Sequence, residues 1–355
     1  MLPDVLPLRL TIDRAALADN WRWLATMSGR AACGAAVKAD GYGLGAVEAV
    51  RVLAEAGCRD FFVASWAEAA ALDAVADGGW PEGLSLSVLH GLRAEDMPAA
   101  LASRARPVLN SVEQVARWRS AAPERPCDVM VDTGMNRLGL TPEQARSGLL
   151  DGLAVDTLLS HLACADEPNH ALNERQLFAF RTLKGLVPAR RYSLANSAGV
   201  CLGQRFAFGL TRPGLALYGG VPVPGDAVQE AGIRSVARIE AQVLQLRDVP
   251  AGLSIGYGAT HVSPGERIAI LNIGYADGYL RGFSGTGIAL ADGKPLPVVG
   301  RVSMDLIAVR VDGADVAEGD WIGIDYRLPE AARRSGLSQY ELLTGLGHRY
   351  QRLWT

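Results

Sequence analysis

The sequence has little of what marks a membrane, nucleic-acid-binding or secreted protein. Its 355 residues include no apolar run of about 18 residues, and the opening Met-Leu-Pro-Asp lacks the basic-then-apolar order of a secretion signal. Charges of the two signs nearly balance, with 35 Lys plus Arg against 38 Asp plus Glu, so no basic footprint for nucleic acid or an anionic membrane is present. We therefore expect a cytoplasmic protein whose ligands are small polar molecules.

Cysteine is also scarce, and its positions argue against two kinds of site. The five cysteines are odd in number and never occur in C-x-x-C spacing, which argues against a disulfide framework and against a thiolate metal site. We expect no metal ion, and we expect most of these thiols to be small buried apolar groups. The positions are Cys33, Cys58, Cys127, Cys164 and Cys201.

Apolar residues make up 49% of the chain, which is enough for a substantial core and two domains. From about residue 33 to 220, short apolar runs alternate with helix-like stretches, and this alternation indicates a parallel sheet. About seven or eight such units favour a (β/α)₈ TIM-type barrel over a doubly wound sheet. The apolar runs lie at 34–37, 60–64, 106–109, 128–131, 156–159, 191–194 and 214–217.

Two helices of this region carry start signals. Ser111 with Gln114 is typical of a capping box, in which each side chain bonds a backbone N–H of the first turn. Thr141 followed by Pro142 predicts an N-cap with proline at the first helical position.

The pattern changes after about residue 225, where β-rich segments replace the strand–helix units. Turn signals at 264–265, 292–293 and 312–313 separate these segments. We predict a barrel over 12–225 and a mostly β domain over 226–355, which the early alternating strand 8–12 joins. The β-rich segments lie at 238–246, 267–271, 287–290, 298–299 and 306–311.

Lysine occurs only three times, and one of the three positions stands out. Lys184 lies in a polar helix-like stretch and Lys294 in a turn, whereas Lys38 ends an apolar run before a Gly-rich loop. At the carboxyl end of a barrel strand, partial burial lowers the pKa of a lysine and makes its neutral amine available for covalent catalysis. The alternative is a strand-end lysine that reaches solvent.

Several loops offer groups that bind anions. The guanidinium of Arg137 follows an apolar strand and can hold a carboxylate, and the segments 196–199 and 212–219 can present Ser197 and backbone N–H groups to a phosphate. Tyr257 lies between two glycines, where a tyrosine is exposed. Each of these residues also has an ordinary explanation as a salt-bridged, loop or turn residue. The Gly-rich stretch 41–45 matches neither the dinucleotide nor the Walker pattern.

Six segments taken together resemble the alanine racemase family. They follow the family's order and spacing over nearly the whole chain, at 36–43, 131–139, 212–219, 257–260, 273–278 and 300–305. The resemblance implies a barrel followed by a β domain, with pyridoxal 5′-phosphate carried by Lys38. It also implies a homodimer in which Tyr257 of one chain completes the active site in the barrel of the other.

The resemblance further implies a two-base interconversion of L-alanine and D-alanine. Lys38 serves the D-alanine face and Tyr257 the L-alanine face, so that a proton leaves one face and another returns on the opposite face. Arg137 and the backbone of Met304 correspond to contacts for the substrate carboxylate.

Other family positions surround the cofactor and the route by which substrate enters. Arg212 corresponds to the residue that faces the pyridine nitrogen, and His161 to the histidine that supports this arginine. The phosphate contacts correspond to Tyr42, Ser197, Gly214 and Leu215, and the route of entry to Tyr275 and Arg281. Asp305 corresponds to a residue that supports the network of the entry route or of the interface.

Two positions depart from the family pattern. Many members have a lysine, which orients the arginine, where this chain has Met130, so Arg137 must be held in another way. Some members have a phosphate-binding tyrosine near His348, and we assign no such contact here.

The sequence leaves other activities open beside alanine racemisation. An apolar pocket rejects one added hydroxyl poorly, so serine remains a second substrate candidate. An amino-acid decarboxylase of the same architecture and a cofactor carrier are weaker alternatives, because segments 257–260 and 300–305 are racemase-like and a carrier needs no β domain. The sequence leaves a biosynthetic and a catabolic role both open.

Overall fold

The computed structural model describes residues 6–75 and 82–355. These residues form two compact units. One comprises residues 17–234, and the other joins residues 6–16 to Ser235–Thr355.

Residues 17–234 form the (β/α)₈ barrel that the alternation predicted. Its parallel sheet has the order β3-β4-β5-β6-β7-β8-β9, and β10 pairs in parallel with β2. The N–H of Arg212 donates to the carbonyl of Ala195 at 2.8 Å, and the N–H of Gly34 donates to Thr211 at 2.9 Å, which closes the ring. The strands are β2 (Ala32–Cys33), β3 (Ala35–Ala36), β4 (Asp60–Val63), β5 (Ser85–Val88), β6 (Arg106–Leu109), β7 (Cys127–Met130), β8 (Val155–Leu159), β9 (Arg191–Ser193) and β10 (Leu210–Thr211).

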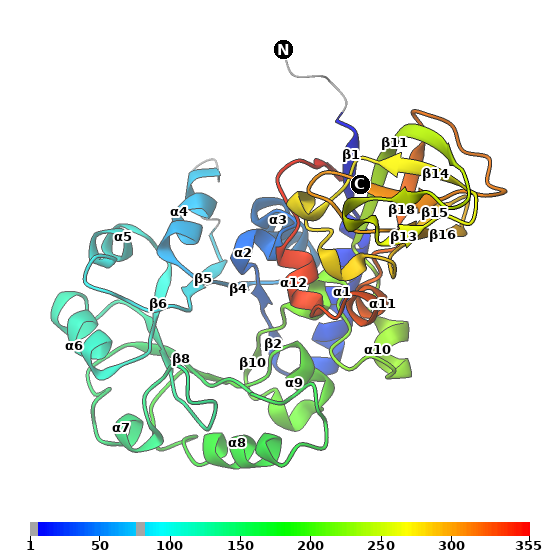
Figure 1. The fold of residues 1–355 in the computed structure, drawn as a ribbon. Coiled ribbons are helices and arrows are strands. Elements are labelled where there is room, and N and C mark those ends of the chain that lie inside the picture. Colours follow the sequence, from blue (N-terminus) through cyan, green and yellow to red (C-terminus); the bar gives the residue numbers. More distant parts are fainter. Residues whose placement is uncertain (1–5, 76–81) are drawn as a thin grey trace. The chain divides into compact units, whose positions relative to one another are not determined.

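Helices lie outside this ring, as Figure 1 shows for α4 to α8. The α-helices are α1 (Arg14–Ser28), α2 (Lys38–Tyr42), α3 (Ala46–Ala56), α4 (Trp66–Val75), α5 (Met97–Ala102), α6 (Val112–Ala121), α7 (Pro142–Arg146), α8 (Ala171–Arg181), α9 (Ser197–Cys201) and α10 (Ala227–Gly232). Two 3₁₀ turns are η1 (Gln204–Phe206) and η2 (Leu215–Tyr218). The predicted N-cap at Thr141 with Pro142 at the first helical position is confirmed, and Thr141 also forms a capping box with Gln144. The one at Ser111 is half formed, because Gln114 bonds the N–H of Asn110 instead.

The run 214–217 is where the strand prediction was wrong. The last strand is β10, and residues from Leu215 onward form η2. Pro213 lacks an N–H for a ladder, and its carbonyl accepts the N–H of Ala36 at 2.9 Å, so the chain turns away directly after β10. A short buried apolar run does not by itself distinguish a strand from a helical turn.

The amino-terminal end of the barrel, called the barrel floor below, holds a network of buried ion pairs. Arg191 donates to both carboxylate oxygens of Asp60 at 2.6 and 2.8 Å and to Asp156 at 3.0 Å. Arg106 lies 2.8 Å from Asp156 and 3.5 Å from Asp128. The partners come from β4, β6, β7, β8 and β9, so the network ties neighbouring and distant strands together.

The second unit is a mostly β domain with an eight-stranded sheet of order β14-β17-β16-β15-β18-β11-β1-β19. Strand β1 lies antiparallel to β11 and parallel to β19. The strands are β1 (Leu8–Ile12), β11 (Ala237–Val249), β12 (Ser254–Ile255), β13 (His261–Val262), β14 (Glu266–Leu271), β15 (Ile288–Ala291), β16 (Lys294–Val299), β17 (Ile307–Arg310), β18 (Trp321–Ile324) and β19 (Gln351–Trp354). The helices are α11 (Leu328–Ser335) and α12 (Gln339–Thr344), with 3₁₀ turns η3 (Tyr257–Ala259), η4 (Tyr275–Asp277) and η5 (Arg281–Phe283).

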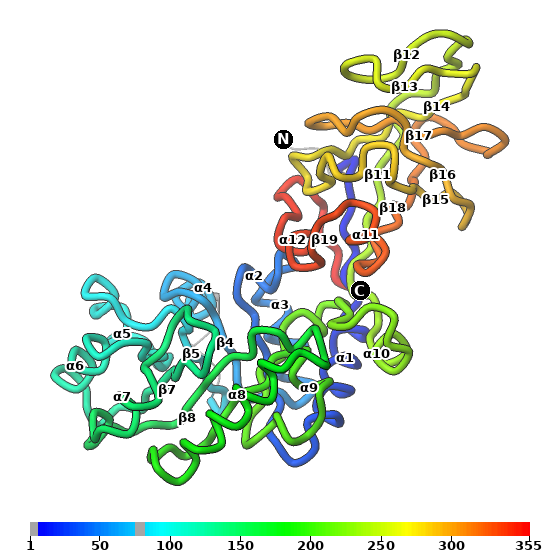
Figure 2. The backbone as a smooth tube through the Cα atoms, turned by 60° about the horizontal axis from the view of Figure 1, so that its bottom comes forward, coloured from blue at the N-terminus to red at the C-terminus, as the bar shows by residue number. Residues whose placement is uncertain are grey.

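Two hairpins of this domain show how local sequence sets its turns. Ala291 pairs with Lys294, so Asp292 and Gly293 form a two-residue loop with φ of 49° and 76°. Positive φ at both positions is what a type I′ turn requires, and Asp-Gly is a favoured pair for it. A second, shorter hairpin joins β12 to β13 (Figure 2) and carries Tyr257 in η3.

Candidate active site

Lys38 lies at the carboxyl end of β3, where a short turn follows the strand. The N–H of Val37 still donates to the carbonyl of Phe62 at 2.9 Å, so the sheet holds the chain up to the residue before Lys38. Burial lowers the pKa of Lys38, the charge of Arg137 lowers it further, and the charge of Glu68 partly opposes both. This position favours the neutral amine more than an exposed position does.

Lys38 belongs to a cluster of basic groups at the carboxyl end of the barrel. Arg137 lies in the loop after β7, His161 follows β8, and Arg212 follows β10. Burial, together with the charges of Arg212, Arg137 and Lys38, lowers the pKa of His161 to about 3, so its imidazole is neutral at ordinary pH. Within residues 6–75 and 82–355, no carboxylate forms an ion pair with Lys38, Arg137 or Arg212. The cluster is therefore suited to anionic ligands.

Arg212 is buried and satisfied by neutral groups. Its guanidinium donates to the hydroxyl of Ser193 and, at 2.5 Å, to the carbonyl of Ser160. Burial lowers its pKa to about 10, with the charge of Asp128 opposing this, so the side chain stays positive at neutral pH. A fixed positive charge is thus held inside the barrel.

The predicted phosphate-binding residues Tyr42, Ser197 and Gly214 lie together. The hydroxyl of Ser197 accepts the N–H of Gly214 at 2.9 Å and that of Ala216 at 3.2 Å. A Cβ atom on Gly214 would lie only 2.1 Å from the hydroxyl of Tyr42, so a side chain there would displace the tyrosine. Leu215 follows directly and is buried in η2. Two hydroxyls and a glycine backbone therefore converge on one spot.

Tyr42 is itself held in place by an aromatic neighbour. Its ring stacks on that of Tyr218 with centroids 4.8 Å apart, and the Tyr218 hydroxyl donates to the carbonyl of Ala36 at 3.0 Å. The stack joins the turn after Lys38 to the turn after β10.

The remaining predicted residues lie in the β-rich domain. The carbonyls of Ser303 and Met304 accept the N–H groups of Tyr275 and Ala276, each at 3.0 Å. The guanidinium of Arg281 lies 5.5 Å from the centre of the Tyr275 ring. The structure therefore brings Tyr275, Arg281 and Met304 into one cluster.

Asp305 joins this cluster through an arginine that the sequence did not single out. Arg349 lies 2.6 Å from Asp305 and donates to both oxygens of buried Asp277 at 2.6 and 2.7 Å. Asp277 also accepts the N–H of Gly274 at 2.9 Å. Because 72 residues separate Arg349 from Asp277, no local motif could have predicted the pair.

Tyr257 is 70% exposed at the tip of its hairpin. Beside it lies a groove of about 370 Å³, lined mainly by apolar side chains and by Arg301. Leu253, Val262 and Leu306 add exposed apolar surface on the same part of the domain. A tyrosine next to an exposed apolar surface is typical of a protein–protein interface.

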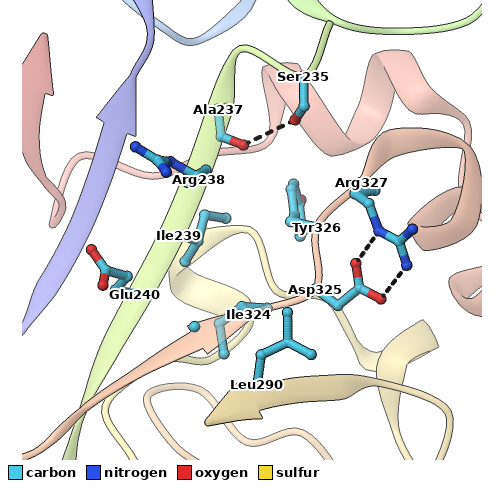
Figure 3. A pocket seen from close by; sticks show the side chains of 11 residues that line it. Ser235, Ala237, Arg238, Ile239, Glu240, Leu290, Ile324, Asp325, Tyr326 and Arg327 are labelled. Carbon is cyan, nitrogen blue, oxygen red and sulfur yellow. Dashed lines mark hydrogen bonds and ion pairs between the residues drawn. The ribbon is translucent and has the colours of Figure 1, made fainter. Parts of the chain in front are cut away.

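Another hollow of the β-rich domain contains no predicted site residue. It has a volume of about 460 Å³ and is lined by the side chains in Figure 3, where Arg327 bonds both oxygens of Asp325 at 2.9 and 3.0 Å. Asp325 and Arg327 are paired with each other, unlike the cations around Lys38. We therefore do not assign it to the active site.

Two further kinds of site receive no support. Within the part of the chain that the structure describes, no group of His, Cys, Asp or Glu side chains is arranged to hold a metal ion. No helix in that part is long and apolar enough to cross a membrane. All five cysteines are free thiols.

Comparisons with known proteins decide which family has this arrangement. The sequence-family model of the alanine racemase N-terminal domain matches residues 12–222, and the family model of the C-terminal domain matches residues 236–354. The chain belongs to the alanine racemase family. An alanine racemase of Methylobacterium nodulans is 42% identical over 97% of this chain and 95% of its own length. The crystal structure of alanine racemase from Bartonella henselae with covalently bound pyridoxal phosphate has a TM-score of 0.91 at 35% identity, covering 99% of this chain and all of that one.

Relatives of both physiological types are equally similar. Agrobacterium fabrum has a catabolic alanine racemase, 42% identical over 97% of this chain and 91% of its own, and a biosynthetic one, 41% identical over 98% and 93%. Identity therefore does not choose between the two roles for this chain.

The structure shows how the arginine loop is held although this racemase-family chain has Met130 in place of a lysine. Asp132 accepts the N–H groups of Gly134 at 2.7 Å, Met135 at 2.9 Å and Arg137 at 3.0 Å. Burial opposes ionisation of Asp132, but these bonds outweigh it and lower its pKa. The carboxylate therefore fixes the backbone that carries Arg137. An Asp before Thr-Gly is a local turn signal, so the sequence contained this information.

Proposed function

We propose that this chain interconverts L-alanine and D-alanine with pyridoxal 5′-phosphate held at the carboxyl end of its barrel. The observation that carries the proposal is the position of Lys38. It is a partly buried lysine of lowered pKa, next to the cationic cluster and to the turn that carries Tyr42. Family membership supplies the reaction, and this arrangement supplies the groups that it needs.

The residues at this end of the barrel fit the cofactor. Tyr42, Ser197, Gly214 and Leu215 would hold the phosphate, since Gly214 leaves room for both hydroxyls. Arg212 would face the pyridine nitrogen and, being positive, would disfavour a proton there. When bound, the cofactor acidifies the Cα–H of the amino acid by drawing the developing negative charge into its ring.

The chain's own residues then hold the substrate and move protons. Arg137 and the backbone of Met304 would hold the carboxylate of alanine. In the L-to-D direction, the Tyr257 oxygen takes the Cα proton from one face and the Lys38 Nζ returns a proton to the other. The D-to-L direction exchanges these roles. The lowered pKa of Lys38 increases the fraction of neutral amine able to accept a proton.

Neighbouring residues support these groups. His161, neutral because of its lowered pKa, would support Arg212 without adding a further charge. Tyr275 and Arg281 would line the way in, and Asp305 would hold that region through Arg349. The five free cysteines accord with a cytoplasmic location.

The two bases would come from different subunits of a homodimer. The exposed hairpin of Tyr257 and its apolar groove are suited to contact with a second copy of the chain. In a two-fold symmetric dimer each subunit both gives and receives this tyrosine.

Borohydride reduction of the purified enzyme, followed by peptide mapping, tests the assignment of Lys38. We expect the pyridoxyl label on Lys38, with L-alanine converted to D-alanine by the unreduced enzyme. A label on Lys184 or Lys294, or release of CO₂ from the substrate, would overturn the proposal. Rates on both enantiomers of alanine and serine measure the substrate preference.

Mixing Lys38→Ala protein with Tyr257→Phe protein tests the shared site. If Tyr257 acts across the interface, a mixed dimer has one site with both bases and one with neither. Two inactive parents should then regain up to about half of the activity per site. Heterodimers shown by mass spectrometry to form without recovery would contradict the sharing.

A further inference from the structure

The turn that carries Lys38 has a backbone that L-amino acids avoid. Ala39 and Asp40 each have φ of 52°, Gly41 61°, Tyr42 56° and Gly43 84°, so five consecutive residues are left-handed. Only the two glycines adopt this conformation without steric cost. The alanine has no polar side chain with which to hold itself there. Backbone bonds within the turn, from the N–H of Gly43 to Ala39 and from that of Gly45 to Asp40, each at 2.8 Å, hold its later residues, whereas the N–H of Ala39 is bonded from outside the turn.

Glu68, in the first turn of α4, supplies that contact. Its Oε1 accepts the N–H of Ala39 at 2.9 Å, and its Oε2 accepts the N–H of Ala64 at 2.7 Å. One carboxylate thus links the residue after Lys38 to the residue after β4. Charge-assisted bonds of this kind are stronger than neutral ones.

We propose that Glu68 is a positioning residue for Lys38. Its carboxylate holds Ala39 in the left-handed conformation, fastens the turn to the end of β4, and so fixes where the Lys38 side chain starts. This inference rests on the proposed role of Lys38 in racemisation and names a residue outside the cluster that contacts substrate or cofactor.

Glu68 also contributes a negative charge near Lys38, which otherwise faces the cation of Arg137 and the neutral imidazole of His161. Arg137 approaches Lys38 from the loop after β7, and His161 from the end of β8. Asp40 lies on the turn itself, where its Oδ1 accepts the N–H of Ala46 at 2.8 Å. Glu68 is the carboxylate whose charge raises the pKa of Lys38. Removing this charge should lower the pKa of Lys38 further.

The variant Glu68→Gln tests both effects in the holoenzyme. An amide has one acceptor oxygen, so either Ala39 or Ala64 loses its partner. We expect kcat to fall about 10- to 100-fold, because the lysine is misplaced. KM should change less than about threefold, because the groups that bind the substrate are unaltered. The acid limb of the pH profile in the direction that uses Lys38 as base should move to lower pH. Amide hydrogen exchange of the segment 39–43 should become at least about tenfold faster.

Two further variants separate position from charge. Glu68→Asp keeps the charge but is too short to reach both N–H groups, so it should restore the pH profile and leave kcat low. Glu113→Gln is the matched control, because Glu113 also lies in the first turn of a barrel helix, α6, and is exposed. It should change neither kcat, the pH profile nor the exchange of 39–43.

The outcomes distinguish this inference from the proposed function. A borohydride label on Lys38 in wild type and variant, with unchanged kcat, pH profile and exchange, would reject the role of Glu68 alone. A label on another lysine in the wild type would reject the role of Lys38. If Glu68→Gln does not fold, Glu68→Asp with wild-type kcat and exchange still contradicts the inference.

Discussion

The two ends of the barrel are both rich in arginine, yet they satisfy its charge in different ways. At the barrel floor, Arg106 and Arg191 lie within 2.6 to 3.0 Å of the carboxylates of Asp60 and Asp156. At the carboxyl end, Arg212 donates to a hydroxyl and a carbonyl instead. The same side-chain type forms ion pairs within the protein at one end, whereas at the other end Arg212 is bonded by neutral groups only.

The residues that stabilise the barrel therefore lie at one end of it, and the residues proposed to act in catalysis lie at the other. Opposite charges that meet in a buried network hold strands together, and breaking such a pair leaves an unpaired charge in the interior. Cations that lack ion-pair partners repel each other and do not stabilise the fold. Their presence indicates a site where a ligand supplies the negative charge. In barrels of this kind the catalytic groups gather at the carboxyl ends of the strands.

The largest expected effect comes from removing the lysine at the carboxyl end. Lys38→Ala should reduce racemisation by at least about 10⁴-fold, since on the proposed mechanism it removes a proton carrier and the cofactor attachment together. The melting temperature of the apoprotein should not fall, because a cation leaves a cluster of like charges. Chiral chromatography and calorimetry measure the two quantities. Lys184→Ala, which changes an exposed lysine, should leave both unchanged.

The opposite pattern is expected at the floor. Arg191→Met should destabilise the protein by about 3–5 kcal/mol, because Asp60 and Asp156 lose a buried partner. At a temperature where the variant is folded, kcat per active site that holds the cofactor should stay at the wild-type value. Urea unfolding at a fixed cofactor concentration gives the first number and steady-state kinetics the second. Adding Asp60→Asn should recover part of the stability; a further loss would speak against pairing as the cause.

The smallest expected effect is a difference between the two ends of the barrel in how their residues make stability depend on pH. His161 has a pKa of about 3 in the folded chain against about 6.5 when unfolded, so the unfolded state binds the extra proton in this window. Stability should therefore fall as pH decreases below about 6.5, by up to about 1.4 kcal/mol per pH unit from this group.

Asp156 acts in the same direction at lower pH. Burial opposes its ionisation, but bonds from Arg190 and the charge of Arg106 outweigh this and lower its pKa to about 2, so its stabilisation is lost only below about pH 4. Asp128 acts in the opposite direction, because burial raises its pKa, and it is unchanged in the wild type and in both variants below. His161→Gln should flatten the stability curve between pH 6 and 4 (roughly the upper part of the histidine window), whereas Asp156→Asn should not. Equal slopes for wild type and His161→Gln would contradict the assignment.

Local sequence determined most of the elements, because their signals act over a few residues. Strand–helix alternation predicted the barrel, Thr141 with Pro142 predicted the start of α7, and Asp292-Gly293 predicted the turn between β15 and β16. The scarcity of lysine singles out Lys38 from the sequence alone. The family motifs pointed to Tyr42, Ser197 and Gly214, which lie together in the structure. They also pointed to the cluster of Tyr275, Arg281 and Met304.

Only the tertiary structure decided which distant groups meet. Arg191 and Asp60 are 131 residues apart, and their pairing follows from closure of the barrel. Glu68 reaches Ala39 only because β3 and β4 are neighbours in the sheet. The run 214–217 became a 3₁₀ turn because Pro213 cannot extend the ladder and Gly214 packs against Tyr42. Short-range patterns specify elements, whereas a contact that depends on how the elements pack has no signal within any one of them.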